Sequence, residues 1–209
     1  MTSATQAIGQ LEKNMDLFIL TYGQFSLLDA LMAVLDQTGP AHVNISTWTA
    51  AHAHLDRSQE LMESADILSY RMIVDRSFKT RQPKYYNHMI NIFGQECVRE
   101  INTHAKFITV RNDQWDIVIR TSMNLNENPR LENLEISDHK GFADFFQAIV
   151  DDIFKEFPPG KQVSDMPQLK SIPETDIFQQ VSANLMKRKN LHEANYTHEI
   201  RNKKVVGKG

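Results

Sequence analysis

Residues 105–121 read AKFITVRNDQWDIVIRT, and the fold can be predicted outward from this segment. It contains two β-rich runs, 105–110 and 115–121, which are separated only by Arg-Asn-Asp-Gln at 111–114. Apolar and β-branched runs of this length favour strands, and Asn and Asp tolerate the positive φ angles of tight turns. The stretch therefore predicts a β-hairpin.

Strand-like and helix-like segments alternate on the N-terminal side of this hairpin. Strands are predicted at 18–22, 42–46 and 67–74, and helices around 28–35, 55–62 and 85–93. Ser26, with Asp29 three residues later, predicts the N-cap of the first helix. After the hairpin we expect a short strand at 133–136 and an amphipathic helix over 140–157. This order predicts an α/β fold, a sandwich in which helices flank a mixed sheet.

The composition is that of an ordinary globular protein. Hydrophobic residues make up 41% of the 209 residues and charged residues 23%. Cys97 is the only cysteine, which excludes an internal disulfide and a multi-cysteine zinc site and indicates a reducing compartment. No secretion signal precedes the first strand, and no apolar run approaches the roughly 18 residues of a membrane span. We therefore expect a cytoplasmic protein that does not enter a membrane.

Composition and charge change near residue 157. Residues 158–173 hold four prolines and predict a linker, and 177–185 carry a short apolar helical face. The net charge is −3, but residues 187–209 carry +5 and the rest of the chain −8. We expect one domain at 1–157 and, at 158–209, a linker, a short helix and a basic tail. The tail is either an arm for an anionic partner or a solvated terminus.

Polar residues recur two positions apart in and beside the hairpin. The pairs are His104 and Lys106, Ser122 and Asn124, and Asn133 and Glu135. Residues i and i+2 of a strand share a face, so each pair projects together, and a three-residue loop would set His104 opposite Ser122. Lys, Ser and Asn donate hydrogen bonds to an oxyanion, while an imidazole attacks or carries a proton. A carboxylate behind the imidazole would fix its tautomer. The set suits attack on a phosphodiester, whose transition state gains charge on its non-bridging oxygens.

In these residues the chain resembles the phospholipase D superfamily, whose signature is HxK, then (G/S)SxN, then NxE. The matching segments are, in order, His104-Ala-Lys106, Thr121-Ser122-Met-Asn124 and Asn133-Leu-Glu135. The resemblance extends over the α/β pattern from about 18 to 157 and implies a phospholipase D-like α/β/α sandwich. The chain has one HxK, so it is similar to the single-motif members of bacteria and phages, which are homodimers with the site on the two-fold axis.

The resemblance also implies a mechanism. His104 forms a phosphohistidine, and His104 of the second chain protonates the leaving oxygen and then activates water. Lys106, Ser122 and Asn124 hold the phosphoryl oxygens, Glu135 orients His104, and no metal or other cofactor is needed.

The chain departs from the family pattern at some positions. Arg111 stands where an aspartate usually follows the lysine by five positions, and Asp113 or Asp116 could substitute for it. Thr121 stands where glycine is common.

The acidic partner of the histidine has two candidates. Glu132 competes with Glu135, and we favour Glu135 because it shares strand parity with Asn133.

The expected function is that of a metal-independent nuclease that acts on DNA or RNA in the cytoplasm of a bacterial or phage-infected cell. The expected substrate-binding residues are the basic patch Arg76, Lys79, Arg81 and Lys84, together with Trp115. A solvated loop is the alternative for the patch, and hairpin packing is the alternative for Trp115. Two other functions stay open. The first is a non-catalytic member that binds nucleic acid or a protein, which Arg111 motivates. The second is a phospholipase or phosphatidyltransferase, although we find no basic amphipathic helix for a membrane surface.

Overall fold

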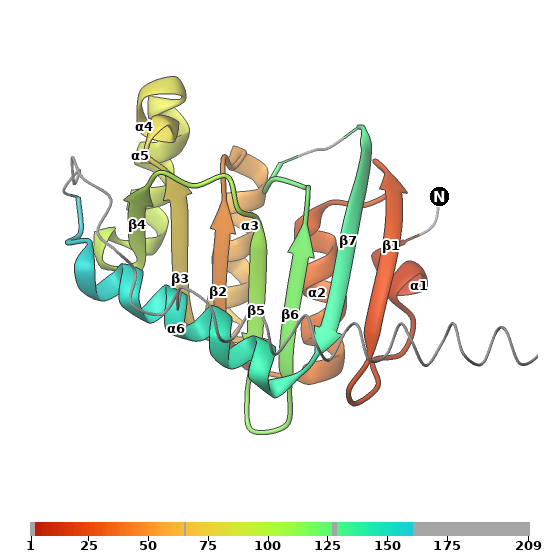
Figure 1. The fold of residues 1–209 in the computed structure, drawn as a ribbon. Coiled ribbons are helices and arrows are strands. Elements are labelled where there is room, and N and C mark those ends of the chain that lie inside the picture. Colours follow the sequence, from red (N-terminus) through yellow and green to blue (C-terminus); the bar gives the residue numbers. More distant parts are fainter. Residues whose placement is uncertain (1–2, 65, 127–128, 161–209) are drawn as a thin grey trace, which may run out of the picture. The chain divides into compact units, whose positions relative to one another are not determined.

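A seven-stranded mixed sheet forms the middle layer of the fold (Figure 1). The computed structural model describes residues 3–64, 66–126 and 129–160. The strands are β1 (Asp16–Tyr22), β2 (Ala41–Thr47), β3 (Ile67–Asp75), β4 (Val98–Ile101), β5 (Phe107–Arg111), β6 (Asp116–Thr121) and β7 (Leu131–Asp138). Their order across the sheet is β1-β7-β6-β5-β2-β3-β4. The β2–β3 and β3–β4 pairs are parallel, and the other pairs are antiparallel.

Helices cover both faces of this sheet. The helices are α1 (Ala4–Ile8), α2 (Leu27–Thr38), α3 (His52–Glu63), α4 (Ser77–Arg81), α5 (Pro83–Phe93) and α6 (Lys140–Glu156), and a short 3₁₀ helix spans Gln95–Cys97. A large apolar cluster, which includes Leu31 of α2 and Met89 of α5, fills one face. A smaller cluster, which includes Phe107 of β5 and Ile153 of α6, fills the other. The predicted α/β sandwich with a mixed sheet and flanking helices is confirmed.

Local signals start and connect several of these elements as predicted. Ser26 caps α2, because its Oγ accepts a hydrogen bond from Asp29 N at 3.1 Å and the Asp29 carboxylate accepts one from Ser26 N at 2.9 Å. The hairpin of β5 and β6 is present, with residues 112–115 as its loop. Its turn needs no positive φ, since Asn14 is the only non-glycine residue with a positive φ among the described residues. Instead Asn112 Oδ1 accepts hydrogen bonds from the next residues, including Trp115 N at 2.9 Å.

Other elements differ from the sequence-based expectation. The strand β4 and the helix α4 were not predicted, because segments of four and five residues carry too little periodicity to be recognised. The HxK segment lies just before β5 rather than in a strand. Apart from 158–160, the predicted linker, helix and basic tail lie outside the described residues. Where the structure is described, we find no helix with the length and apolar character to cross a membrane.

Candidate active site

The candidate site lies at the sheet edge where the parallel strands have their carboxyl ends. An edge of the sheet here means one of the two sides at which its strands begin or end, and not an edge strand. The chain leaves β2, β3 and β4 at this edge, and it enters β5 and leaves β6 there (Figure 1, upper edge). The loops that follow therefore gather in one place, which is where α/β folds commonly bind ligands. We call residues 102–106, which join β4 to β5, the histidine loop.

Hydrogen bonds to two strands hold the histidine loop. Thr103 N donates to Asp75 Oδ2 at 3.2 Å, at the end of β3. Ser46 Oγ of β2 donates to the Ala105 carbonyl at 2.9 Å, and Ala105 N donates to Thr103 Oγ1 at 3.1 Å. His104 lies between these anchored residues and is exposed. The fold thus presents an imidazole to solvent from a fixed backbone.

His104 and Lys106 contact each other, as their spacing predicted. Lys106 Nζ lies 3.3 Å from His104 Nδ1 and donates to the His104 carbonyl at 2.9 Å. Partial burial lowers the pKa of Lys106 below its ordinary value of 10.5, and the nearby charge of Glu132 partly offsets this. Lys106 also places its charge where it can meet an anion that approaches His104.

Ser122 lies beside this pair but not in the expected register. Thr121 N donates to the Lys106 carbonyl at 3.2 Å. The ladder pairs Phe107 with Arg120, so its continuation sets Ala105, and not His104, opposite Ser122. The register prediction was wrong by one residue, because the loop of the hairpin has four residues rather than three.

The acidic neighbour of Ser122 is Glu132. Ser122 Oγ donates to Glu132 Oε2 and accepts a hydrogen bond from Asn133 N at 3.0 Å. Glu132 stands one position after the start of β7 and is half-buried. Glu132 thus accepts the hydrogen bond of Ser122, and its negative charge also favours the charged form of Lys106.

Glu135 lies on the other face of the sheet. Leu134 and Ile136 of β7 pack into the core on the α2 side, so the alternation of the strand turns Asn133 and Glu135 towards the α6 side. There Glu135 Oε2 forms an ion pair of 2.9 Å with Arg120, and Glu135 Oε1 accepts a hydrogen bond from Asn133 Nδ2 at 3.3 Å. The structure therefore brings Glu132, and not the favoured Glu135, to Ser122 and Lys106.

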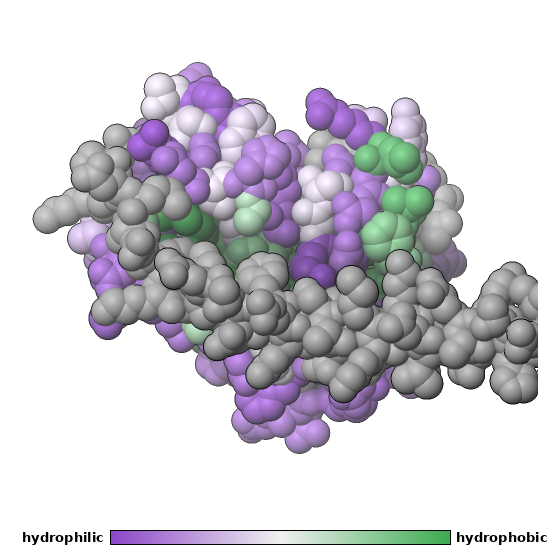
Figure 2. Space-filling model, viewed as in Figure 1, coloured by the Kyte–Doolittle hydropathy of each residue, from purple (hydrophilic) through white to green (hydrophobic). Residues whose placement is uncertain are grey.

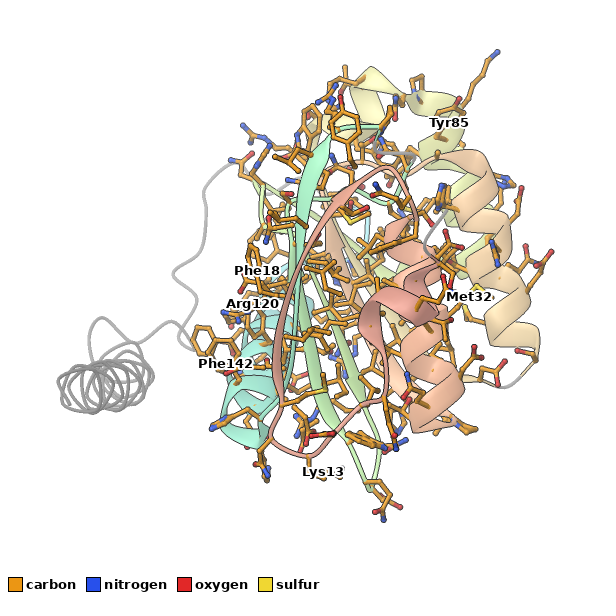
Figure 3. The ribbon with its side chains drawn as sticks, turned by 90° about the vertical axis from the view of Figure 1, so that its right-hand side faces the viewer. Lys13, Phe18, Met32, Tyr85, Arg120 and Phe142 are labelled. Carbon is orange, nitrogen blue, oxygen red and sulfur yellow. The ribbon has the colours of Figure 1, made fainter. Side chains whose placement is uncertain are left out.

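The pair of Glu135 and Arg120 belongs to the packing of α6. The Arg120 guanidinium lies 4.8 Å from the centre of the Phe142 ring. Arg120, Phe142 and Phe18 of β1 lie on the same side of the sheet, opposite Met32 of α2 (Figure 3). Parity with Asn133, which favoured Glu135 in the sequence, selects this face rather than that of Glu132.

Asn124 lies in the turn after β6, at the same sheet edge. Its neighbour Leu125 is buried, and Leu125 N donates to the Thr49 carbonyl at 3.3 Å and to Thr47 Oγ1 at 3.2 Å. Ala51 N donates to the Leu125 carbonyl at 2.9 Å. These bonds fasten the turn that carries Asn124 to the loop after β2.

Arg111 lies at the opposite edge of the sheet from His104. Five positions separate it from Lys106, which is about 17 Å along a strand. Its Nη2 forms ion pairs of 2.6 Å with Asp116 and 2.8 Å with Asp144 of α6. Arg111 thus closes the hairpin onto α6. The departure from the family pattern does not touch the candidate site, and neither Asp113 nor Asp116 comes to it.

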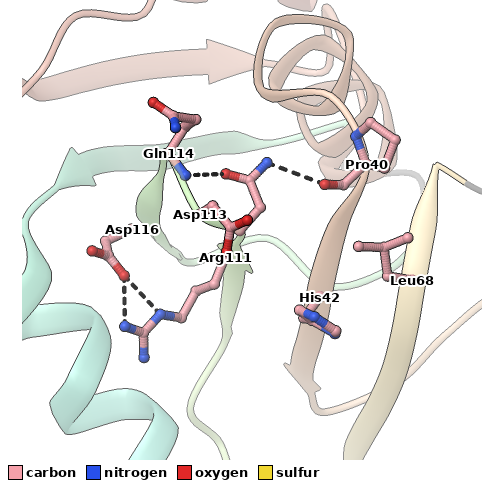
Figure 4. A pocket seen from close by; sticks show the side chains of 8 residues that line it. Pro40, His42, Leu68, Arg111, Asp113, Gln114 and Asp116 are labelled. Carbon is pink, nitrogen blue, oxygen red and sulfur yellow. Dashed lines mark hydrogen bonds and ion pairs between the residues drawn. The ribbon is translucent and has the colours of Figure 1, made fainter.

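The hairpin edge carries a separate hollow. A cavity of about 630 Å³ there is lined by residues that include His42, Leu68 and Arg111 (Figure 4). Trp115 lies in the loop at the same end, packs against the core and is covered by Lys13, whose Nζ lies 3.5 Å from the centre of the ring. Trp115 therefore lies far from His104, and its ring packs at the loop of the hairpin.

The basic patch divides into different environments. Arg76 and Lys84 are exposed. Lys79 Nζ lies 3.9 Å from the buried carboxylate of Glu100 and 5.0 Å from the centre of the Tyr86 ring. Lys79 thus partly neutralises a buried acid, while Arg76 and Lys84 are exposed, and the role of the four residues in binding stays a prediction.

Arg81 approaches His104 through a residue that the sequence reading missed. The Arg81 guanidinium lies 3.8 Å from the centre of the Trp48 ring, and the Trp48 ring lies 5.7 Å from that of His104. Trp48 directly follows β2, at the carboxyl end of a predicted strand, and this position was the signal that could have identified it.

The described residues hold no group of three or more His, Cys, Asp or Glu side chains that could bind a metal ion.

Comparisons with known proteins identify the fold. No protein-family model and no curated protein matches the chain. Among solved structures, Nuc from Salmonella typhimurium, a phospholipase D family member, aligns with a TM-score of 0.51 at 16% identity, over 71% of this chain and 100% of that one. NucT from Helicobacter pylori aligns with a TM-score of 0.50 at 14% identity, over 69% of this chain and 99% of that one. The described residues therefore have a phospholipase D-like fold.

Proposed function

We propose that this protein is a metal-independent phosphodiesterase, a nuclease that cleaves DNA or RNA through a phosphohistidine as a homodimer. One observation carries the proposal: an exposed imidazole on an anchored loop contacts an ammonium at 3.3 Å, at the ligand-binding edge of a phospholipase D-like sheet. The match of HxK and SxN to the superfamily supports the same chemistry.

The reaction uses His104 as nucleophile. A ring nitrogen of His104 attacks phosphorus, a P–N bond forms and the bond from phosphorus to the leaving oxygen breaks, while His104 of the second copy gives its proton to that oxygen. The second imidazole then takes a proton from water, the water oxygen attacks phosphorus, and the P–N bond breaks to release a phosphomonoester. Each imidazole ends the cycle in its starting form.

The neighbours of His104 stabilise the charge that develops on the phosphoryl oxygens. The Lys106 ammonium donates one hydrogen to the His104 carbonyl, and another is available for a phosphoryl oxygen. Asn124 lies at the same edge, and its amide can donate to another oxygen. The hydroxyl of Ser122 gives its single hydrogen to Glu132, so Ser122 donates to a phosphoryl oxygen only when that bond opens. Glu132, rather than Glu135, is the carboxylate of this arrangement, because it accepts the hydrogen bond of the Ser122 hydroxyl and its charge acts on Lys106.

A second copy is needed because the chain contains one HxK and the cycle uses two imidazoles. An apolar strip on β1 and β7 supports such an association. It consists of Phe18, Leu20, Tyr22 and Leu131, each at least 60% exposed (Figure 2, right). Tyr22 pairs with Leu131 in the sheet, next to Glu132, so the strip reaches the edge that carries the candidate site. An exposed apolar patch of this kind marks an interaction surface.

Nucleic acid is the proposed substrate because cationic side chains lie around the same edge. Arg76, Arg81 and Lys84 follow β3 within a few residues, and such residues make most contacts to a phosphate backbone.

The test is cleavage of plasmid and single-stranded DNA in EDTA. We expect cleavage by the wild type and none by His104→Ala, with both proteins dimeric by light scattering. His42→Ala is the matched control, since His42 is exposed at the opposite edge of the sheet, and it should cleave normally. Cleavage by purified His104→Ala would overturn the site, and a shifted but uncut band with the wild type would identify a binding protein.

A further inference from the structure

Trp48 and Arg81 form a stacked pair beside the candidate nucleophile. The Arg81 guanidinium lies 3.8 Å from the centre of the indole, and the indole lies 5.7 Å from the His104 ring at an interplanar angle of 49°. Trp48 is half-buried, whereas Arg81 and His104 are exposed. The Trp48 ring therefore contacts the Arg81 guanidinium and also lies next to the His104 ring.

The position of Arg81 is fixed by more than this stack. Arg81 Nε donates to Ser77 Oγ at 3.0 Å, and Arg81 Nη2 donates to the Trp48 carbonyl at 3.3 Å. Ser77 in turn donates through its backbone N to Asp75 Oδ1 at 3.0 Å. The other oxygen of Asp75 accepts the Thr103 bond that anchors the histidine loop. One carboxylate therefore sets the positions of both the stacked arginine and the nucleophile.

This arrangement prepares a binding surface in advance. A solvent-exposed arginine ordinarily has many rotamers, and a ligand that orders it bears the entropy cost. Here the indole and the two hydrogen bonds already restrict Arg81. The guanidinium carbon lies over the Trp48 ring at 3.8 Å, and Arg81 as a whole is exposed, so solvent reaches the cation that the indole holds.

We propose that Trp48 and Arg81 form a subsite that stacks an unpaired nucleobase next to the phosphate held at His104. Guanidinium planes stack on bases, and an aromatic ring beneath the guanidinium holds it flat for that contact. Bases in a duplex are stacked on each other and offer no free plane, so the subsite selects single-stranded DNA or RNA. The inference rests on the proposed nuclease function and names its substrate class.

The test separates recognition of the base from recognition of the phosphate. Fluorescence anisotropy in EDTA would compare a labelled 12-residue thymidine oligonucleotide with an abasic oligomer that carries the same phosphates. All measurements would use a parent protein that carries His104→Ala, so that the oligonucleotide is not cleaved during binding. Into this parent we would introduce Trp48→Ala, which changes no charge, and Arg81→Lys, which keeps the charge but removes the plane. Arg71→Ala is the matched control, because Arg71 lies 5.4 Å from the Phe154 ring and pairs with Asp151 of α6.

We expect the parent to bind the thymidine oligomer more tightly than the abasic one. Both Trp48→Ala and Arg81→Lys should raise Kd for the thymidine oligomer by about 5- to 100-fold, the range for one stacked base. Their Kd for the abasic oligomer should stay that of the parent, and Arg71→Ala should change neither. If Trp48→Ala lowers Tm strongly, its binding data cannot be interpreted. Arg81→Lys then tests the proposal, because Arg81 is exposed.

Two results would overturn the subsite alone. Either the parent binds both oligomers equally while the wild type still cleaves DNA, or both variants keep the parent's preference for bases. Failure of the nuclease proposal looks different, because the wild type would then leave DNA uncut, whether or not the parent binds the oligomers.

Discussion

Glu132→Gln and Glu135→Gln test which carboxylate serves the candidate site. Glu132 accepts the hydrogen bond of Ser122 and lies near Lys106, whereas Glu135 pairs with Arg120 at 2.9 Å on the α6 face. Both substitutions keep the size of the side chain and remove one negative charge. Each variant is therefore the matched control of the other.

The structure predicts that Glu132→Gln lowers the rate of cleavage and that Glu135→Gln lowers only the stability of the fold. In Glu132→Gln, Ser122 loses a charged acceptor, and a hydrogen bond to a charged group is worth about 1.5–3 kcal/mol. If that bond holds the site in its working geometry, the rate falls about 10- to 100-fold. In Glu135→Gln, the side chains of Arg120 and Glu135 are 35% and 29% exposed, so the lost ion pair is worth about 1 kcal/mol. The melting temperature should then fall by about 2–4 °C, with cleavage unchanged.

The assay combines kinetics with thermal unfolding. We would measure kcat/KM for bis(4-nitrophenyl) phosphate in EDTA, and Tm by circular dichroism. Glu132→Gln should lose rate and also some Tm, because its hydrogen bond contributes to stability as well, and Glu135→Gln should lose Tm at the wild-type rate. Loss of rate in Glu135→Gln with full rate in Glu132→Gln would refute the assignment from strand faces, and equal losses in both would refute it as well.

Two further predictions concern Arg111 and Lys106. Arg111→Asp restores the residue usual in the superfamily but breaks the ion pairs with Asp116 and Asp144, so we expect a loss of about 1–2 kcal/mol in the free energy of unfolding, with kcat unchanged. Denaturant titration and steady-state kinetics measure these effects, and a higher kcat would contradict the position assigned to Arg111. Burial lowers the pKa of Lys106, so its ammonium loses its charge at a lower pH than an ordinary lysine, and the alkaline limb of the kcat/KM profile should lie below pH 10.5. Lys106→Arg keeps its charge and should move this limb to higher pH, and a limb that does not move belongs to another group.

Several parts of the fold follow from signals that act within a few residues. Ser26 and Asp29 cap α2 through their own backbone groups, and the apolar runs around residues 111–114 form β5 and β6. The contact of His104 with Lys106 is also local, because two positions separate the residues and the lysine reaches back to its own loop. Patterns of this kind can be read without knowledge of any distant partner.

Other parts depend on distant segments. Trp48 meets His104 because β2 and β5 are neighbours in the sheet, although 56 positions separate the two residues in the chain. Asp75 anchors the histidine loop for the same kind of reason, since β3 ends at the edge where that loop begins. Neither residue belongs to a short motif, so the position at or just after the end of a strand was the only sign of its role in the sequence.

The α/β class, the hairpin and the contact of His104 with Lys106 depend on neighbours along the chain, so they could be predicted from the residues alone. The contact of Glu132 with Ser122, the ion pair of Glu135 with Arg120, and the positions of Trp48 and Arg81 beside the histidine became visible in the folded chain. Adjacent residues of a strand point to opposite faces, and the strand order and packing of the whole sheet set which face carries which group.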